Sequence, residues 1–380
     1  MKWSGWILLI LMAAAPAWAA RKITVQQLKD LLASDQQAKK TDAEVATELR
    51  DVELTEELTR GLMNSLVADV PGQLTSEQIY VLEARSAVLA PPADELPATP
   101  APDAATQKAI LYKAIEYATK TYAQLPNLAA TKNTRRFQDN AQVPEGSVGA
   151  HSMAVPATPV AFIRYTDSTD TPVTLQNGAE QIPSAKDKTS WGANGMIALL
   201  GQGPVLNTIL QEAQAAGKIT WLRWETLNGH PFAVYSFAVD KKKTHYAVNY
   251  CCFPDSNQAG PMAMRGTEQV GTRGNYQVAT NWKNYKATVP YHGEIFVDPD
   301  TGIIARLITV ADFKSSDLVL QEDQRIDFGS VTVGGKALVL PVRSFIDTME
   351  RPDGDDGPAR FNIRHTLFTA EYKNYQAAGS

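Results

Sequence analysis

His245, Asn249 and Cys251 are of the three residue types that form a thiol-protease triad, in which the histidine takes the thiol proton and the amide orients the imidazole. All three fall on one face of a predicted strand, Thr244–Phe253, because even numbers of residues separate them. His245 and Cys251 are six residues apart, about 20 Å along a strand, whereas a hydrogen bond needs about 3 Å. This strand alone does not build the triad, although another histidine can approach Cys251 in space.

Cys251 and Cys252 are the only cysteines and are adjacent. Neighbouring Cα atoms lie ~3.8 Å apart, below the ~4.4–6.8 Å that disulfides usually span, and on a strand the two side chains point to opposite faces. A vicinal disulfide would need a strained turn just before Pro254. Three states stay open: reduced and packed thiols, a vicinal disulfide, or an intermolecular or redox-active pair.

Two other stretches resemble ligand-binding motifs but depart from them. Gly329–Lys336 has an extra glycine before its lysine and Ala337 after it, so it lacks the phosphate-loop pattern and instead favours a hairpin. Asp298–Gly302 has its glycine one position early for a calcium loop, and Thr309 stands where the loop needs glutamate. We interpret it as a turn.

The acidic segment Asp353–Gly357 can hold calcium only weakly, and we interpret it as a solvated surface loop. The histidines outside the predicted strand have no metal-ligand spacing. The sequence therefore assigns no catalytic residue, no metal site and no cofactor, and it leaves the binding residues unidentified.

The N-terminal third of the chain has helical patterns. Thr24 with Gln27, and Thr75 with Gln78, match the capping box that satisfies free amides at a helix start. Two apolar stripes have helical spacing: Val25, Leu28, Leu31 and Leu32, then Leu54, Leu58, Leu62 and Leu66. Pro71-Gly72 separates two helices. Ala90–Asp103 is rich in proline and predicts a linker, followed by an amphipathic helix over Ala104–Leu125.

From about Thr131 the pattern favours antiparallel strands. Asn228-Gly229 accommodates the positive φ of a hairpin turn. The predicted hairpin strands are Ile219–Leu227 with Phe232–Val239, Ala287–Val297 with Ile303–Val310, and Asp327–Val333 with Lys336–Leu340; Thr244–Phe253 is a further strand and Phe361–Tyr375 a closing one. An apolar helix is expected over Gly203–Ala216.

The register of the second hairpin follows from its five-residue turn. Val297 should pair with Ile303, which makes Glu294 and Arg306 direct cross-strand neighbours. The fold class predicted from these elements is α+β: a helical N-terminal region, then a curved, half-barrel-like antiparallel sheet packed on an embedded helix. The expected division is residues 1–19, a helical region over 20–126 and a β-rich domain over 127–380.

The first residues of the chain predict its compartment, and the composition limits which partners it can bind. Lys2, the short apolar run Trp6–Ala15 and the small-x-small site Ala17-Trp18-Ala19 predict a cleavable secretory signal and a periplasmic or secreted protein. No later segment is long and apolar enough to predict a membrane span. The net charge of −5, without basic blocks, argues against nucleic acid or anionic lipid as the main partner.

The chain resembles a group of exported bacterial proteins that has no established activity. The matching stretches are Thr41–Leu58, Leu125–Phe137, Trp221–Gly229, Gly293–Leu307 and Phe328–Pro341. In its strand–DPDTG–strand unit and strand order, the β half also resembles the lipoprotein-carrier (LolA-like) fold. That resemblance implies a curved sheet over an apolar helix, and it transfers no functional residue.

The function expected first is non-catalytic binding of an apolar or lipid-like ligand, or of an envelope protein, in the concavity of the sheet. This expectation rests on fold analogy. The alternatives are a scaffolding protein that interacts through its helical half and, third, a secreted hydrolase. An apolar cavity with few charges would favour the first, a filled core with an exposed apolar patch on the helices the second, and a pocket with perturbed His or carboxylate groups the third. Oligomeric state is not readable.

The signal prediction has a direct test. Because signal peptidase cuts after a small-x-small site, the mature chain should begin at Ala20. N-terminal sequencing of protein recovered from the periplasm or medium measures this, and an intact Met1 in that material would contradict it.

Overall fold

The computed structural model describes residues 21–139, 163–181, 198–199, 206–254, 263–264, 277–278, 282–351 and 363–378. The expected signal segment and the acidic loop Asp353–Gly357 lie outside these residues, as does the predicted start of the helix at Gly203. No helix among the described residues is long and apolar enough to cross a bilayer.

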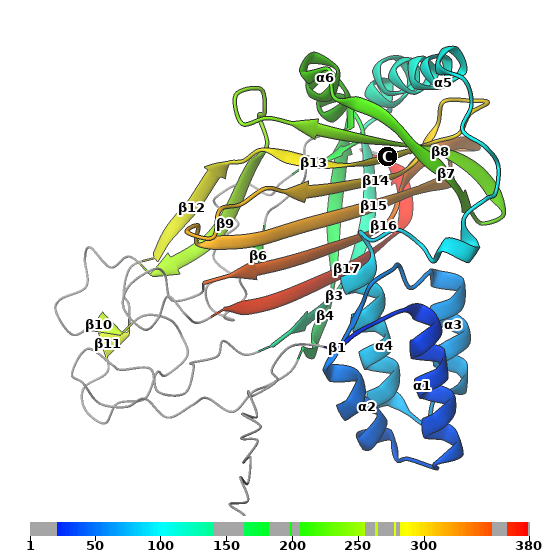
Figure 1. Ribbon diagram of the computed structural model, residues 1–380. Helices are drawn as coiled ribbons and strands as arrows, with labels where there is room; N and C mark the ends of the chain where they lie inside the picture. Colours follow the sequence, from blue (N-terminus) through cyan, green and yellow to red (C-terminus); the bar gives the residue numbers. More distant parts are fainter. Residues whose placement is uncertain are drawn as a thin grey trace, which may run out of the picture.

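The N-terminal part is a bundle of four helices: α1 (Val25–Gln37), α2 (Asp42–Arg50), α3 (Arg60–Asp69) and α4 (Gln73–Ser86) (Figure 1). Two short parallel strands, β1 (Arg21–Ile23) and β2 (Val52–Leu54), pair beside them. The Thr24 capping box is confirmed at the start of α1, and Thr41 with Glu44 forms a second one at α2. Buried apolar residues from all four helices and both strands form one core.

Two predictions for this bundle are wrong. Thr75 does not cap a helix: α4 begins at Gln73, and the buried Thr75 hydroxyl donates to the Asp42 carboxylate. The second leucine stripe is not one helix face either, because Leu54 lies in β2 and Leu58 in the connection to α3. Both leucines are buried in the bundle core, so burial without a helix accounts for their apolar character.

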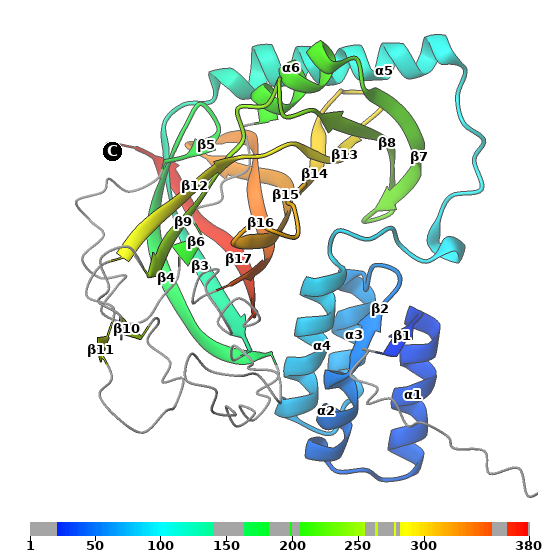
Figure 2. The same cartoon turned by 60° about the vertical axis from the view of Figure 1, so that its left-hand side comes forward.

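The segment that follows α4 leaves the bundle. Ala90–Asp103 contains one 3-10 turn, η1 (Ala93–Glu95), and its path leads to the far side of the sheet, as Figure 2 shows. There the predicted helix is confirmed as α5 (Ala104–Glu116), continued by the π turn η2 (Tyr117–Thr121) and the 3-10 turn η3 (Tyr122–Gln124).

Ten antiparallel strands form the main sheet, in the order β5-β4-β3-β17-β16-β15-β14-β13-β8-β7. In chain order these strands are β3 (Leu128–Gln138), β4 (Arg164–Gln176), β5 (Ala179–Glu180), β7 (Ile219–Leu227), β8 (His230–Val239), β13 (Tyr291–Val297), β14 (Ile304–Ala311), β15 (Val319–Val333), β16 (Lys336–Glu350) and β17 (Arg364–Ala377).

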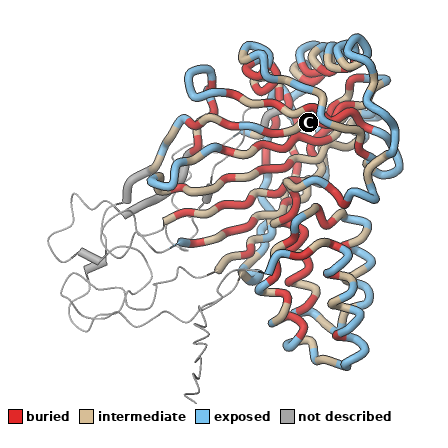
Figure 3. The backbone as a smooth tube through the Cα atoms, viewed as in Figure 1, coloured by how far each residue is buried: buried red, intermediate tan, exposed pale blue. Residues whose placement is uncertain are grey.

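We call the face of the sheet that carries α5 and α6 (Leu206–Ala216) the inner face, and the face that carries α4 the outer face. Ile295 and Val297 point to the inner face and pack with the helices, whereas Phe296 between them belongs to a cluster on the outer face. Figure 3 shows buried residues along the central strands and through the bundle. The predicted α+β class, a curved antiparallel sheet on an embedded helix, is confirmed.

A second sheet takes part of the chain that was expected in the first. It has the order β12-β9-β6, from β12 (Trp282–Thr288), β9 (Ala247–Pro254) and β6 (Ala198–Leu199). The predicted strand Ala287–Val297 is therefore wrong as one element: it breaks at Val289-Pro290 into β12 and β13, because proline removes a ladder donor. A two-stranded parallel pair, β10 (Ala263–Met264) and β11 (Gln277–Val278), stands apart.

The turns are as predicted and the position of the last strand is not. Asn228-Gly229 and Gly334-Gly335 have positive φ and close the β7–β8 and β15–β16 hairpins. The Asp298–Gly302 turn is held by Asp298, whose Oδ1 accepts from two backbone amides within it. The last strand, β17, does not close an edge but lies between β16 and β3.

The predicted pairing of Glu294 with Arg306 is wrong. A bulge after Phe296 shifts the β13–β14 register, so that Glu294 lies opposite Ile308 and Arg306 opposite Phe296. The Arg306 guanidinium stands 5.1 Å from the centre of the Phe296 ring. Both charged side chains remain on the outer face, but each binds a partner from a different element: Glu294 accepts from Arg223 of β7.

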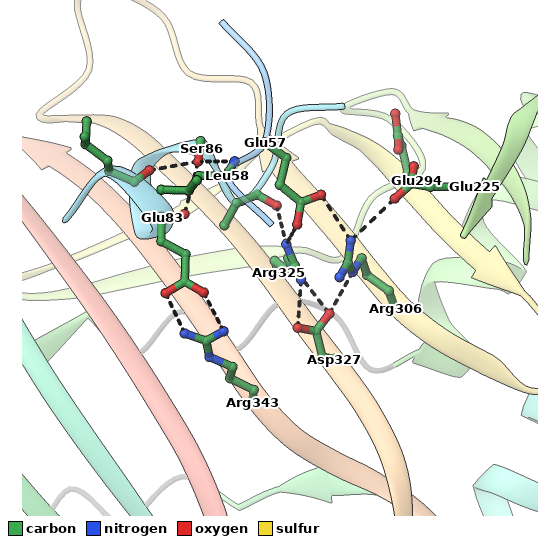
Figure 4. Close-up of polar contacts among 12 residues, drawn as sticks. Glu57, Leu58, Glu83, Ser86, Glu225, Glu294, Arg306, Arg325, Asp327 and Arg343 are labelled. Atoms are coloured by element: carbon green, nitrogen blue, oxygen red, sulfur yellow. Dashed lines mark hydrogen bonds and ion pairs between the residues drawn. The ribbon is translucent and has the colours of Figure 1, made fainter. Parts of the chain in front are cut away.

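Arg306 belongs to a buried ionic network between the outer face and the bundle (Figure 4). Glu57, from the connection before α3, accepts from Arg325 of β15 and from Arg306. Arg325 also donates twice to Asp327, at 3.0 and 2.9 Å, and Arg306 donates to the same carboxylate at 2.7 Å. Next to this network, Arg343 of β16 donates to both oxygens of Glu83 on α4.

The network is buried, and it extends to Glu225 of β7, whose carboxylate lies 3.6 Å from Arg306. Glu57 and Arg325 are each about 5% exposed in their side chains. Burial alone would raise the pKa of Asp327, but Arg325 and Arg306 hold it well below its usual range. Removing one partner from such a set leaves a buried charge uncompensated, which costs more than the intact pair contributes.

Glu57→Gln tests how much the bundle depends on this network. Glutamine keeps the shape but leaves Arg325 with Asp327 alone and Arg306 with Asp327 and Glu225, so the free energy of unfolding should fall by roughly 3 kcal/mol. Urea denaturation measures it. The matched control is Glu53→Gln, which removes an exposed pair with Lys22 at 3.8 Å and should cost less than about 1 kcal/mol. Equal losses in the two variants would contradict the network's role.

Candidate functional site

Cys251 and Cys252, the residues singled out from the sequence, lie in β9. β9 pairs with β12 through Tyr250 opposite Tyr285 and Phe253 opposite Lys283, with an irregular register between them. That irregularity falls opposite the two cysteines. Their thiol state stays a prediction, because the structure describes only the backbone at these positions.

His245 is held by Glu212 of α6. Its Nδ1 lies 2.7 Å from Oε1 of Glu212, and its backbone amide donates to the same oxygen at 2.9 Å. The other oxygen of Glu212 accepts from the Tyr291 hydroxyl at 2.8 Å. His245 therefore helps to attach α6 to the end of the sheet, while its side chain is 86% exposed.

The inner face contains a second buried acid, Glu322 of β15. Its Oε1 accepts from the Tyr246 hydroxyl at 2.9 Å, and its Oε2 has no hydrogen-bond partner among the described residues. Burial raises the pKa of Glu322 to about 7. The Tyr246 and Tyr291 rings pack edge to face, with centroids 5.4 Å apart, and join the two acidic residues into one region.

This region was the expected ligand site, because it lies in the concavity of the sheet. The described part of it is filled by the protein's own side chains: α5, η3 and α6 bury Ile110, Tyr122 and Ile209 against the inner face. These residues form one continuous core with Tyr235 and Tyr291. The inner face thus provides packing over these residues.

A groove of about 490 Å³ lies on the bundle between α1 and α3. One face of α1 lines it with Lys29, Leu32, Ala33 and Gln36, which have the spacing i, i+3, i+4, i+7 of a single helix face. The opposite wall comes from the end of α3 and the turn after it. The remaining lining residues are Asp35, Lys39, Lys40, Val45, Leu66, Asp69, Val70 and Pro71.

The polar end of the groove is built around Asp35. This residue is 2% exposed, and its Oδ1 binds the Lys40 ammonium at 2.7 Å. Lys40 also contacts Glu48 of α2, and these two carboxylates raise the pKa of Lys40, Asp35 most strongly. The second oxygen of Asp35 is buried and has no hydrogen-bond partner among the described residues. A buried carboxylate oxygen in that state favours a ligand or water that donates to it.

Local sequence positions these groups. The capping box at Thr24 fixes the rotation of α1, so that Leu28 enters the bundle core and Leu32 lies at its edge. Lys39 follows the end of α1 with a φ of 53°, which turns the chain toward α2. Leu32 and Leu66 belong to the two apolar stripes of the sequence, whose spacing favours a core over a partner groove. The row of Lys29, Ala33 and Gln36 along the edge of the first stripe is the sequence signal of the groove.

Comparisons with known proteins give little support for assigning a function. No family model matches the chain. No curated protein matches it either. Among solved structures, a LolA superfamily protein of Nitrosomonas europaea matches over 72% of this chain and 94% of its own, at 9% identity and a TM-score of 0.23. At this identity and TM-score the match supports no argument about the family or the ligand.

Glu322 gives a prediction for the inner face. Its folded pKa of about 7 lies above its ordinary 4.5, so its contribution to stability is full below pH ~4.5 and is lost as the pH rises to about 7. In the wild type this lowers the free energy of unfolding by roughly 3 kcal/mol between pH 4.5 and 7, and the loss should be absent in Glu322→Gln. Urea denaturation between pH 4 and 8 measures it, with Glu53→Gln as the exposed control. A wild-type pH slope in Glu322→Gln would contradict the assignment.

Proposed function

We propose that this chain is a non-catalytic binding module that works outside the cytoplasm and holds a lipid-like ligand in the groove between α1 and α3. The observation that carries the proposal is the groove itself. Its volume of about 490 Å³ is in the range of small-molecule sites, roughly 300–1,000 Å³, and such sites combine an apolar lining with a few placed polar groups.

The apolar part of the groove suits a hydrocarbon body. Leu32, Leu66 and Val70 pack against the bundle core on one side and remain partly exposed to the groove on the other. A ligand lying over them would remove this surface from water, which is the main favourable term in binding an apolar group. The three residues come from two elements of the same bundle, so the groove exists before the ligand arrives.

The polar part suits a head group that carries a hydrogen-bond acceptor. The ammonium groups of Lys29 and Lys39 at the rim can donate to it. Lys40 is already engaged by Asp35 and Glu48. The chain as a whole is acidic, so the attraction that the lysines offer is local to the groove.

The proposal keeps the ligand class that was expected first and places it in the helical half. The alternative is a scaffolding role through the same helices. Two observations favour this alternative: the inner face is filled, and the bundle has an apolar surface. The volume of the groove, about 490 Å³, favours a small ligand over a flat protein contact. The location outside the cytoplasm rests on the predicted signal at residues 1–19.

Ala33→Trp is designed to fill the groove without altering the core. Ala33 is exposed on α1 and lines the groove, so an indole there occupies ligand space and leaves the fold intact. Affinity for a fluorescent polyene fatty acid, measured by titration, should fall at least about tenfold, because a bulky group replaces ligand contacts. The matched control is Ala43→Trp, an exposed alanine of α2 that does not line the groove.

The two variants separate the possible outcomes. A loss confined to Ala33→Trp supports the groove as the site. If both variants and the wild type bind the fatty acid with equal affinity, the fatty acid binds outside the groove, which contradicts the proposal. A wild-type chain that binds no fatty acid, but whose contact with an envelope protein is lost in Ala33→Trp, supports the scaffolding alternative.

A further inference from the structure

We propose a second binding site, for a small phosphate-type oxyanion, in the pocket where α3 and α4 meet the outer face of the sheet. The pocket holds about 120 Å³ and has one wall from the bundle and one from β3, β16 and β17. Its lining is polar and contains three arginines: Arg60 on α3, Arg135 on β3 and Arg343 on β16. The proposal is independent of the groove between α1 and α3.

The charges of this pocket do not cancel. Two carboxylates line it, and both have cationic partners already. Arg343 binds Glu83 through two hydrogen bonds of 2.8 Å, which matches one arginine to one carboxylate. Glu371 is bound by Lys373 at 2.9 Å, outside the pocket lining, and by Arg60 at 3.3 Å. Arg60 therefore shares an anion that Lys373 already neutralises.

Arg135 supplies the excess charge. Its guanidinium lies over the Tyr80 ring, 5.9 Å from the centroid, and among the described residues it has no carboxylate partner. The aromatic ring orients a planar guanidinium while leaving its N–H groups available for hydrogen bonds. Within the lining, three arginines face two carboxylates, so the pocket has one positive charge in excess.

The remaining polar groups suit an oxyanion. The Thr369 hydroxyl and the Asn64 amide line the same pocket and can each donate a hydrogen bond. Arginine binds phosphate and carboxylate through paired N–H groups, and several converging arginines favour the more highly charged phosphate. The small volume admits one such group, either inorganic phosphate or the end of a phosphomonoester.

The position of the pocket gives the ligand a structural consequence. Because Arg60 and Asn64 belong to the bundle and Arg135 and Thr369 to the sheet, a bound oxyanion contacts both. Binding to the folded state alone raises its stability by mass action. The oxyanion would therefore reinforce the same junction that the buried ionic network holds.

Thermal unfolding of the full mature chain tests the proposal, in 10 mM phosphate and in chloride of equal ionic strength. Phosphate should raise the wild-type Tm by about 2 °C more than its general salt effect, and Arg135→Gln should lose that increment. Arg135 is exposed, so the variant folds. The matched control is Arg85→Gln, which removes one positive charge from the last turn of α4 outside the pocket and should keep the increment.

Glycerol phosphate and acetate, used in the same way, identify the chemical class. A rise in Tm with both phosphate compounds, and none with acetate, supports a phosphate site. The proposal is overturned by an absent increment in the wild type, by an equal increment in Arg135→Gln, or by acetate acting as well as phosphate. An equal increment would show the general effect of phosphate on protein hydration.

Discussion

The contact between Glu57 and the two arginines of the sheet, Arg306 and Arg325, is the interaction on which the arrangement of this protein depends. It joins a connection of the bundle to the outer face of the sheet across more than two hundred residues of sequence. Asp327 binds both arginines from the sheet side. Such a set tolerates little displacement, because a shift that separates Glu57 from the arginines leaves charge buried without a partner. Apolar contacts of α4 with Phe137, Phe345 and Leu367 surround it.

This attachment decides which surfaces remain free. α4 faces the sheet, so that α1 and the outer side of α3 face away from it (Figure 1). The inner face is occupied by α5 and α6, which bury their own side chains there. We therefore propose the ligand-binding role for the bundle, where Leu32 and Leu66 border an open groove.

The sequence predicted elements better than it predicted their assembly. The Thr24 cap, the Asn228-Gly229 and Gly334-Gly335 turns and the helix from Ala104 depend on local rules and are confirmed. The register of Glu294 depended on a bulge with no local signature, and the place of β17 depended on pairings between distant segments. The groove could not be predicted, because Leu32 looks the same in sequence whether it lies in a core or at its edge. The ionic network was missed for a similar reason: Glu57 and Arg325 meet only in three dimensions.

The most direct test of a ligand in the groove is a map of where an apolar ligand touches the chain. A fatty acid with a photoreactive diazirine on its alkyl chain, bound to the mature protein and activated by light, attaches covalently to the residues beside it. Peptide mass spectrometry then locates the label. Our account predicts labelled peptides from α1 and from the end of α3, around Leu32 and Leu66, and their loss when unlabelled fatty acid competes. Competed label on the inner-face strands, with none on α1 or α3, would contradict it.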